Sequence, residues 1–233
     1  MRIDEWWFAT ASGRNTVVDA LLPSGSGTYV RVFPPAIKFD DYAAEIRVPW
    51  REVARAHGTV MHPGAEWGSI TRTWNPEPWD PCWDEAPNAG GVDEGTAHLL
   101  AGLLAESNDG DAVVCNIARW ATPRRFVRMP IGASVSRPEA DFDAYMLSGS
   151  RVSIAASLGD AFTVPCAVWP KSGRWCVRIH DDLITPYVYC SDDDLAGRLI
   201  ASEELEVLRI EADQRFSWDC DEVNPLPAPP YAT

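Results

Sequence analysis

Residues 164–190, with the sequence VPCAVWPKSGRWCVRIHDDLITPYVYC, constrain the fold of this chain most strongly. Two runs rich in β-branched and aromatic residues flank a turn signal at residues 171–173. A third run, residues 187–190, follows a polar break at residues 181–182. The segment therefore predicts a β-hairpin and a third strand, with Pro170 at a strand end or sheet edge because proline cannot donate to a sheet ladder.

The side chains after this turn alternate in character. Successive strand residues point to opposite faces, so Trp175, Val177 and Ile179 share one apolar face that is suited to a core. Residues 191–194 supply a capping residue and first-turn acids, which predicts a helix over residues 195–201. Its inward side chains are expected to be Leu195, Leu199 and Ile200, and a strand at residues 205–210 follows.

The remaining segments extend the same pattern of mixed elements. Periodicity and capping predict strands at residues 28–33, 112–120 and 126–131, helices at residues 15–22, 50–57, 93–107 and 152–158, and a strand or helical turn at residues 141–147. The order of elements predicts an α+β fold: a single domain with a mixed or antiparallel sheet and helices packed mainly on one face.

Residues 58–92 are rich in tryptophan, proline and glycine and are expected to form a long irregular excursion, with a short extended piece at residues 69–72. We expect the folded domain to span residues 1–223. Residues 224–233 are expected to form a flexible proline-rich tail.

Net charge limits the class of partner. The chain carries a net charge of −14, which repels phosphate backbones and argues against nucleic-acid binding, whereas it suits a basic protein partner. No signal peptide or membrane-spanning run is predicted, so the expected location is cytoplasmic, with reduced cysteines. The six cysteines form no CxxC pair, and neither a metal site nor a cofactor is predicted. No feature of the sequence predicts an oligomeric state.

Four polar residues are weak catalytic candidates. His62 and Glu66 lie four residues apart, but Pro63 and Gly64 between them favour a turn over the helix that an HExxH-type zinc site requires. Asp182 forms an acidic pair with Asp181 that could bind a metal or act as acid and base, and His180 adjoins this pair. The alternative is a structural or solvated role for all four, because perturbed groups also occur in plain ion pairs.

Eleven tryptophans are unusual in a chain of 233 residues. Four of them lie in the excursion and are candidates for a stacking surface that binds a ligand or partner: Trp67, Trp74, Trp79 and Trp83. The alternative is core packing, since tryptophan brings a large apolar area with one polar handle.

Several segments together resemble a family of actinobacterial proteins of similar length that has no assigned activity. The resemblance is carried by TYVRVFPPA at residues 28–36, WREVARAHG at residues 50–58 followed by HP at residues 62–63, the stretch WP…RWCV at residues 169–177, TPYVYCSDDDLAGRLIASEELEVLRI at residues 185–210, and the closing Asp221 and Asn224. The family typically has a histidine where residues 33–35 read FPP here. The resemblance implies one soluble domain and no mechanism.

These observations leave three functional hypotheses. The leading one is a non-enzymatic binding or immunity-like protein that covers a basic surface, because the chain is acidic and lacks GxSxG, Walker and GxGxxG motifs. The second is a hydrolase-like or metal-dependent enzyme built on the four polar candidates. The third is a small-ligand binder with a cleft between residues 58–92 and the hairpin at residues 164–190.

Overall fold

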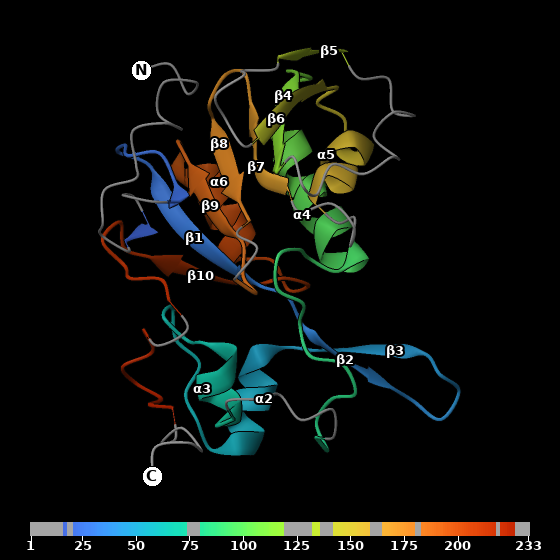
Figure 1. Ribbon diagram of the computed structural model, residues 1–233, viewed down its shortest axis with the longest axis vertical. Coiled ribbons are helices and arrows are strands. Elements are labelled where there is room, and N and C mark those ends of the chain that lie inside the picture. The colour runs from blue at the N-terminus through green and yellow to red at the C-terminus, as the bar shows by residue number, and fades with distance from the viewer. Residues whose placement is uncertain are drawn as a thin grey trace.

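The computed structural model describes residues 16–17, 21–73, 80–118, 132–135, 142–158, 165–179, 183–217 and 220–226. Its centre is a sheet of eight strands in the order β10-β1-β9-β8-β7-β4-β6-β5, and the strands pair antiparallel throughout (Figure 1). The strands are β1 (Thr28–Phe33), β4 (Val113–Ala118), β5 (Gly132–Val135), β6 (Phe142–Leu147), β7 (Pro165–Pro170), β8 (Trp175–Arg178), β9 (Tyr187–Cys190) and β10 (Glu206–Ile210). The α+β class and the antiparallel form of the sheet are confirmed.

The predicted hairpin forms as β7 and β8, and its register places Val168 opposite Val177. Gly173 closes the turn with a φ of 71° and donates its N–H to the carbonyl of Pro170 at 2.9 Å. A side chain rarely tolerates this left-handed backbone, which explains the glycine. Pro170 is the last residue of β7, as expected from its missing N–H.

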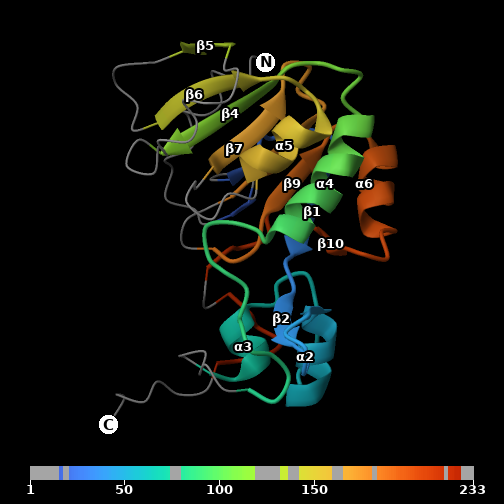
Figure 2. The ribbon, with the colours of Figure 1, turned by 90° about the vertical axis from the view of Figure 1, so that its right-hand side faces the viewer.

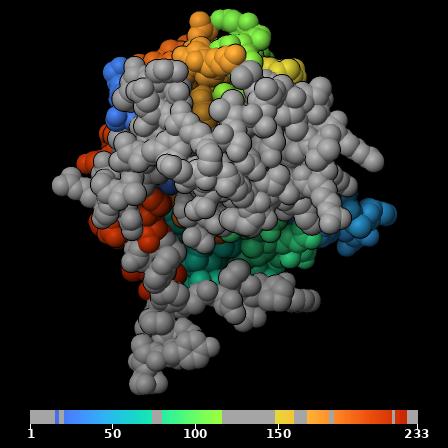
Figure 3. Space-filling view, turned by 45° about the horizontal axis from the view of Figure 1, so that its top comes forward, coloured from blue at the N-terminus to red at the C-terminus, as the bar shows by residue number. Residues whose placement is uncertain are grey.

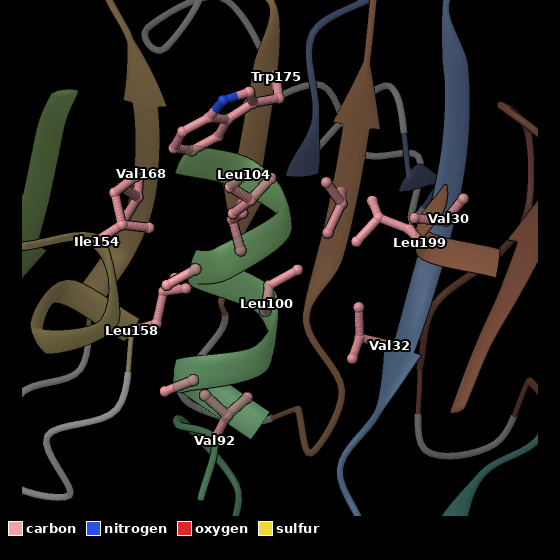
Figure 4. Close-up of a cluster of buried hydrophobic side chains, with 14 of the residues drawn as sticks. Val30, Val32, Val92, Leu100, Leu104, Ile154, Leu158, Val168, Trp175 and Leu199 are labelled. Atoms are coloured by element: carbon pink, nitrogen blue, oxygen red, sulfur yellow. The ribbon is translucent and has the colours of Figure 1, made fainter. Parts of the chain in front are cut away.

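Three helices cover one face of the sheet: α4 (Glu94–Glu106), α5 (Arg151–Leu158) and α6 (Asp193–Ile200) (Figure 2). Their apolar side chains pack on Val30, Val168 and Trp175 of the strands in the largest buried cluster (Figure 4). Val177 and Ile179 belong to the same cluster, so the predicted alternation is confirmed. Cys176 faces the opposite side of the sheet, in a second cluster with Leu21, Leu22 and Tyr187.

A side-chain cap confirms the helix start predicted at Asp93, whereas the helix predicted from residue 195 begins two residues earlier, at Asp193, with Asp192 as its cap. Asp93 accepts from the N–H of Thr96 at 3.0 Å, and Asp192 accepts from the N–H of Leu195 at 2.9 Å. One expectation on α6 is wrong, because Ile200 is 38% exposed while Leu195 and Leu199 are buried. Ile200 is the last residue of the helix, at the edge of the buried stripe.

A small lobe lies beside one end of the sheet and consists of β2 (Ala36–Phe39), β3 (Glu45–Val48), α2 (Trp50–His57) and α3 (Trp67–Thr71) (Figure 1). The hairpin β2–β3 was not predicted; it projects from the lobe, as the space-filling view also shows (Figure 3). The extended piece expected at residues 69–72 is wrong, because residues 67–71 are helical. The hydroxyl of Thr71 donates to the carbonyl of Trp67 at 2.8 Å and supports this single helical turn.

The small lobe has its own core. Val53 and Ile70 pack there with Trp50, whose ring N–H donates to the carbonyl of Pro34 at 2.6 Å. Helix α2 buries Trp50, Val53 and Ala54 on one side and ends before Gly58, which has a left-handed φ of 65°. Among the helices within the described ranges, none is long and apolar enough to cross a membrane.

Candidate functional site

A buried polar cluster joins the sheet, the small lobe and the C-terminal segment. Its centre is Arg31 in the middle of β1, with a side chain only 2% exposed. Its guanidinium donates to Glu66 Oε1 at 2.7 Å, Thr185 Oγ1 at 2.6 Å and the carbonyl of Pro63 at 3.2 Å. Arginine is rarely buried unless it is paired, and here two separate segments, residues 63–66 and Thr185, supply the partners. We call these residues, with those described next, the polar clamp.

Aromatic rings and charge keep Arg31 ionised inside the protein. The guanidinium carbon lies 5.0 Å from the ring centre of Phe33 and 5.3 Å from that of Tyr187, within cation–π range. Burial lowers the pKa of Arg31, but the charges of Glu66 and Tyr187 outweigh it and raise the pKa overall. Burial raises the pKa of Glu66, and Arg31 opposes that rise by stabilising the carboxylate.

Asp221 forms the second half of the polar clamp. Its Oδ1 lies 2.8 Å from His62 Nε2, and its Oδ2 accepts from the backbone N–H of Glu66 at 3.3 Å. Asn224 donates to Asp221 Oδ2 at 3.0 Å and also pairs with both backbone groups of Val60 at 2.8 Å. Residues 220–224 are therefore fastened to the turn at residues 60–66. Asn224, expected at the start of a flexible tail, is buried.

The hydrogen bonds of His62 disfavour a role in acid–base catalysis. Its Nδ1 accepts from the N–H of Gly64 at 3.2 Å, so the proton of the neutral ring is on Nε2 and is donated to Asp221. Both ring nitrogens therefore have internal partners. Cys220 donates its thiol to Glu66 at 3.6 Å, and burial raises the pKa of Cys220 to about 11. A thiol that stays protonated is a poor nucleophile.

The structure thus brings together two of the four polar candidates, His62 and Glu66, through Asp221 and Arg31. The predicted turn between them forms, because the N–H of Ala65 donates to the carbonyl of His62 at 3.0 Å. His180 and Asp182 lie outside the described residues. The geometry of the described pair supports the structural alternative.

Trp67 and Trp83 are each only 3% exposed. Their rings meet edge to face with centres 5.0 Å apart, and Trp67 meets Trp50 in the same way at 5.0 Å. Such pairs add stability beyond the area they bury. The burial of these two rings favours core packing over an open stacking surface. Trp74 and Trp79 lie outside the described residues.

An open cleft of about 400 Å³ lies between the two lobes. The end of β1, the start of α2, helix α4 and the loop before β10 surround it, and these elements can be followed in Figure 2. Its lining includes the apolar side chains Phe33, Pro35 and Leu99 and four glutamates: Glu52, Glu203, Glu204 and Glu206. The volume falls within the roughly 300–1,000 Å³ of typical ligand sites. We call this hollow the acidic cleft.

The two arginines of the acidic cleft already have partners. Arg47 donates to Asp93 and, at 2.7 Å, to Thr96 Oγ1. Arg51 Nε lies 3.6 Å from Glu206 Oε1. The other three glutamates are exposed and have no ion-pair partner within the part of the chain that the structure describes. The cleft therefore presents negative charge that the protein itself does not neutralise.

Sequence analysis did not identify this cleft, because its glutamates come from segments about 150 residues apart. The one local signal was the adjacent pair Glu203-Glu204 before a strand, which resembles any solvated loop. A further group, His57, Asp80 and Cys82, brings metal-binding atoms together on the small lobe.

Comparison with protein-family models, curated proteins and solved structures found no match to this chain.

Proposed function

We propose that this chain is a non-enzymatic binding protein that receives the basic side chains of a partner protein in its acidic cleft. An immunity-like protein that covers a basic surface is one form of such an activity. The observation that carries the proposal is the convergence of four glutamates on one hollow, with both nearby arginines already paired. The net charge of −14 would add long-range attraction toward a basic partner.

The chemistry of the acidic cleft suits arginine in particular. Exposed carboxylates accept the two parallel hydrogen bonds of a guanidinium, which lysine cannot form. Leu99 and Pro35, which are partly exposed, offer apolar surface to the stem of such a side chain. Residues of strand β1 and helix α4 form part of its walls.

The alternative of hydrolase-like chemistry has less support. His62 and Glu66, its two described candidates, are bonded to Asp221 and Arg31 in a way that catalysis would have to break. The third hypothesis, a small-ligand cleft lined by tryptophans, also has less support, because Trp67 and Trp83 pack in the core of the small lobe.

The test uses a short fluorescent oligoarginine peptide and two charge-matched variants. E203K/E204K reverses charge at the acidic cleft, whereas E211K/D213K reverses the same amount of charge at exposed residues beyond the other end of β10. A charge pair at about 4 Å contributes roughly 1 kcal/mol in water, and reversal replaces attraction with repulsion. We expect E203K/E204K to weaken binding at least about tenfold, which corresponds to roughly 1.4 kcal/mol.

E211K/D213K should bind the peptide with nearly the affinity of the unaltered protein. Equal losses in the two variants would mean that the peptide senses only overall charge, and the proposed cleft would be wrong. Absence of binding by the unaltered protein at low salt would contradict the proposal outright.

A further inference from the structure

Three side chains with metal-binding atoms meet on the small lobe, away from the acidic cleft. They are His57, the last residue of α2, and Asp80 and Cys82 on the turn that leads to Trp83. One nitrogen, one carboxylate oxygen and one sulfur from these residues all lie within 4.8 Å of one another. His57 Nε2 is 3.1 Å from Asp80 Oδ2. All three residues are partly buried, so the group is neither a solvated patch nor a sealed core.

The surrounding contacts orient the side chains of His57 and Asp80. The His57 ring packs against the Trp83 ring, with centres 5.5 Å apart. Asp80 uses Oδ1 to accept from the N–H of Cys82 at 2.8 Å, which leaves Oδ2 toward the histidine. Asp80 and Trp83 form an isolated β-bridge that closes the turn. Such supporting contacts are typical of the groups that orient metal ligands.

The Nε2 atom of His57 supplies a second observation. It is buried, and it has no hydrogen-bond partner among the residues that the structure describes, although a carboxylate lies nearby. Buried polar atoms normally have a partner, and those without one call for an explanation. A metal ion placed between the nitrogen, the carboxylate and the sulfur would provide it.

We propose that His57, Asp80 and Cys82 bind a zinc ion. Thiolate, imidazole and carboxylate are the ligand types that zinc takes, in a tetrahedral set with nearest distances of about 2.0–2.3 Å. Three protein ligands leave a fourth position for water. Magnesium and calcium are disfavoured because they prefer oxygen ligands alone.

Binding requires the Cys82 thiolate, so the thiol proton leaves to solvent as the metal–sulfur bond forms. The thiolate and the Asp80 carboxylate together supply two negative charges to the divalent ion. Lys38, whose ammonium donates to the carbonyl of Pro81, is the one cation in contact with this turn among the described residues. Its positive charge would repel the metal ion and offset part of this attraction. The ion would link the end of α2 to residues 80–82 and so close a chain segment of the small lobe.

This site has no consecutive motif, which is why sequence analysis predicted no metal. His57 stands 23 positions before Asp80, and only Asp80 and Cys82 are near neighbours. The fold of the small lobe brings them together.

The experiment titrates the metal-stripped full chain with Zn²⁺ and, separately, with Co²⁺ as a spectroscopic probe. Bound cobalt with a cysteine ligand gives a strong near-ultraviolet charge-transfer band. The variants are Cys82→Ser and His57→Gln, and the matched control is His98→Gln, whose side chain is half exposed on α4. A parallel measurement follows alkylation of Cys82 by mass spectrometry with and without zinc, and circular dichroism reports whether each variant is folded.

We expect one zinc ion per chain, the charge-transfer band with cobalt, and protection of Cys82 from alkylation. Cys82→Ser should lose the band, and both ligand variants should bind zinc at least about 100-fold more weakly, the upper end of what loss of a supporting group alone costs. His98→Gln should bind as the unaltered protein does. Zinc binding that is equal in all variants, a cobalt complex without the sulfur band, or an absence of binding would each overturn the proposal. If Cys82→Ser fails to fold, the alkylation result on the unaltered chain decides.

Discussion

Replacing Arg31 by methionine should destabilise the protein by an amount that depends on pH. Arg31→Met removes the cation beside Glu66 and leaves that buried carboxyl without its main partner. Glu66 can then remain charged in an apolar site or take up a proton. At pH 7 protonation costs about 1.36 kcal/mol for each unit above the ordinary carboxyl value of 4.5, or roughly 3.4 kcal/mol. At pH 5 the same cost is only about 0.7 kcal/mol.

Lost hydrogen bonds from Arg31 to Thr185 and Pro63 add roughly 1 kcal/mol each at either pH. The total near pH 7 is then about 5 kcal/mol, which agrees with the loss of about 3–5 kcal/mol typical of broken buried pairs. The sign follows from linkage. Burial already raises the folded-state pKa of Glu66, and the loss of Arg31 raises it further, so stability is present below the unfolded value and is lost as pH increases.

Urea unfolding of Arg31→Met at pH 5 and pH 7 measures the effect through the transition midpoint, provided that the slope with urea is unchanged. The double variant Arg31→Met/Glu66→Met is the control, because it has no ionisable group at the pair and should lose similar stability at both pH values. A destabilisation by Arg31→Met that is the same at pH 5 and pH 7 would show that Glu66 is not confined as described, and the polar clamp would be refuted.

Three further predictions concern the cores and the C-terminal segment. Burial raises the pKa of Cys176 from 9.0 to about 12, so its contribution to stability is present below pH 9 and is lost between pH 9 and 12. In Cys176→Ala the free energy of unfolding, measured with urea, should therefore decrease less over this pH range than in the unaltered protein. Leu100→Ala should cost about 2–5 kcal/mol, whereas Ile200→Ala should cost under about 0.5 kcal/mol, because Leu100 is fully buried and Ile200 is exposed at a helix end; thermal melts compare them. Asn224→Ala should release residues 220–226 and speed hydrogen exchange at the amide of Val60, because this N–H donates to Asn224 Oδ1. Unchanged exchange at Val60 would contradict the role of Asn224 in holding the C-terminal segment.

Local patterns in the sequence were sufficient to predict the elements of the sheet face. Alternation around Gly173 placed Trp175 and Val177 in the core, and Asp93 and the polar run at residues 191–194 indicated that helices follow. These features depend on neighbours within a few residues, so the sequence contains them. The hairpin β2–β3 was missed for the converse reason: its strands are short, and its apolar residues Phe39 and Ile46 are partly or largely exposed, without a clear buried face.

One feature of the sequence indicates the polar clamp. Arg31 lies in the middle of an otherwise apolar strand, TYVRVF, where a charge demands a buried partner. The partner, Glu66, is 35 positions away and could not be paired with it from sequence alone. Asp221 and Asn224 are part of the family resemblance, but the sequence alone indicates no chemical role for them. In the structure they hold the C-terminal segment through their hydrogen bonds. The resemblance itself stays a prediction.

The measurement that tests the functional account most directly is the affinity of the unaltered protein for the oligoarginine peptide as salt increases. Screening shortens the reach of exposed charges from about 30 Å at 0.01 M to about 8 Å at 0.15 M ionic strength. If the exposed glutamates Glu52, Glu203 and Glu204 hold the peptide, affinity should fall steadily over this range, and an oligoglutamate peptide of equal length should not bind. Affinity that is indifferent to salt, or equal binding of both peptides, would contradict the acidic cleft as the binding site.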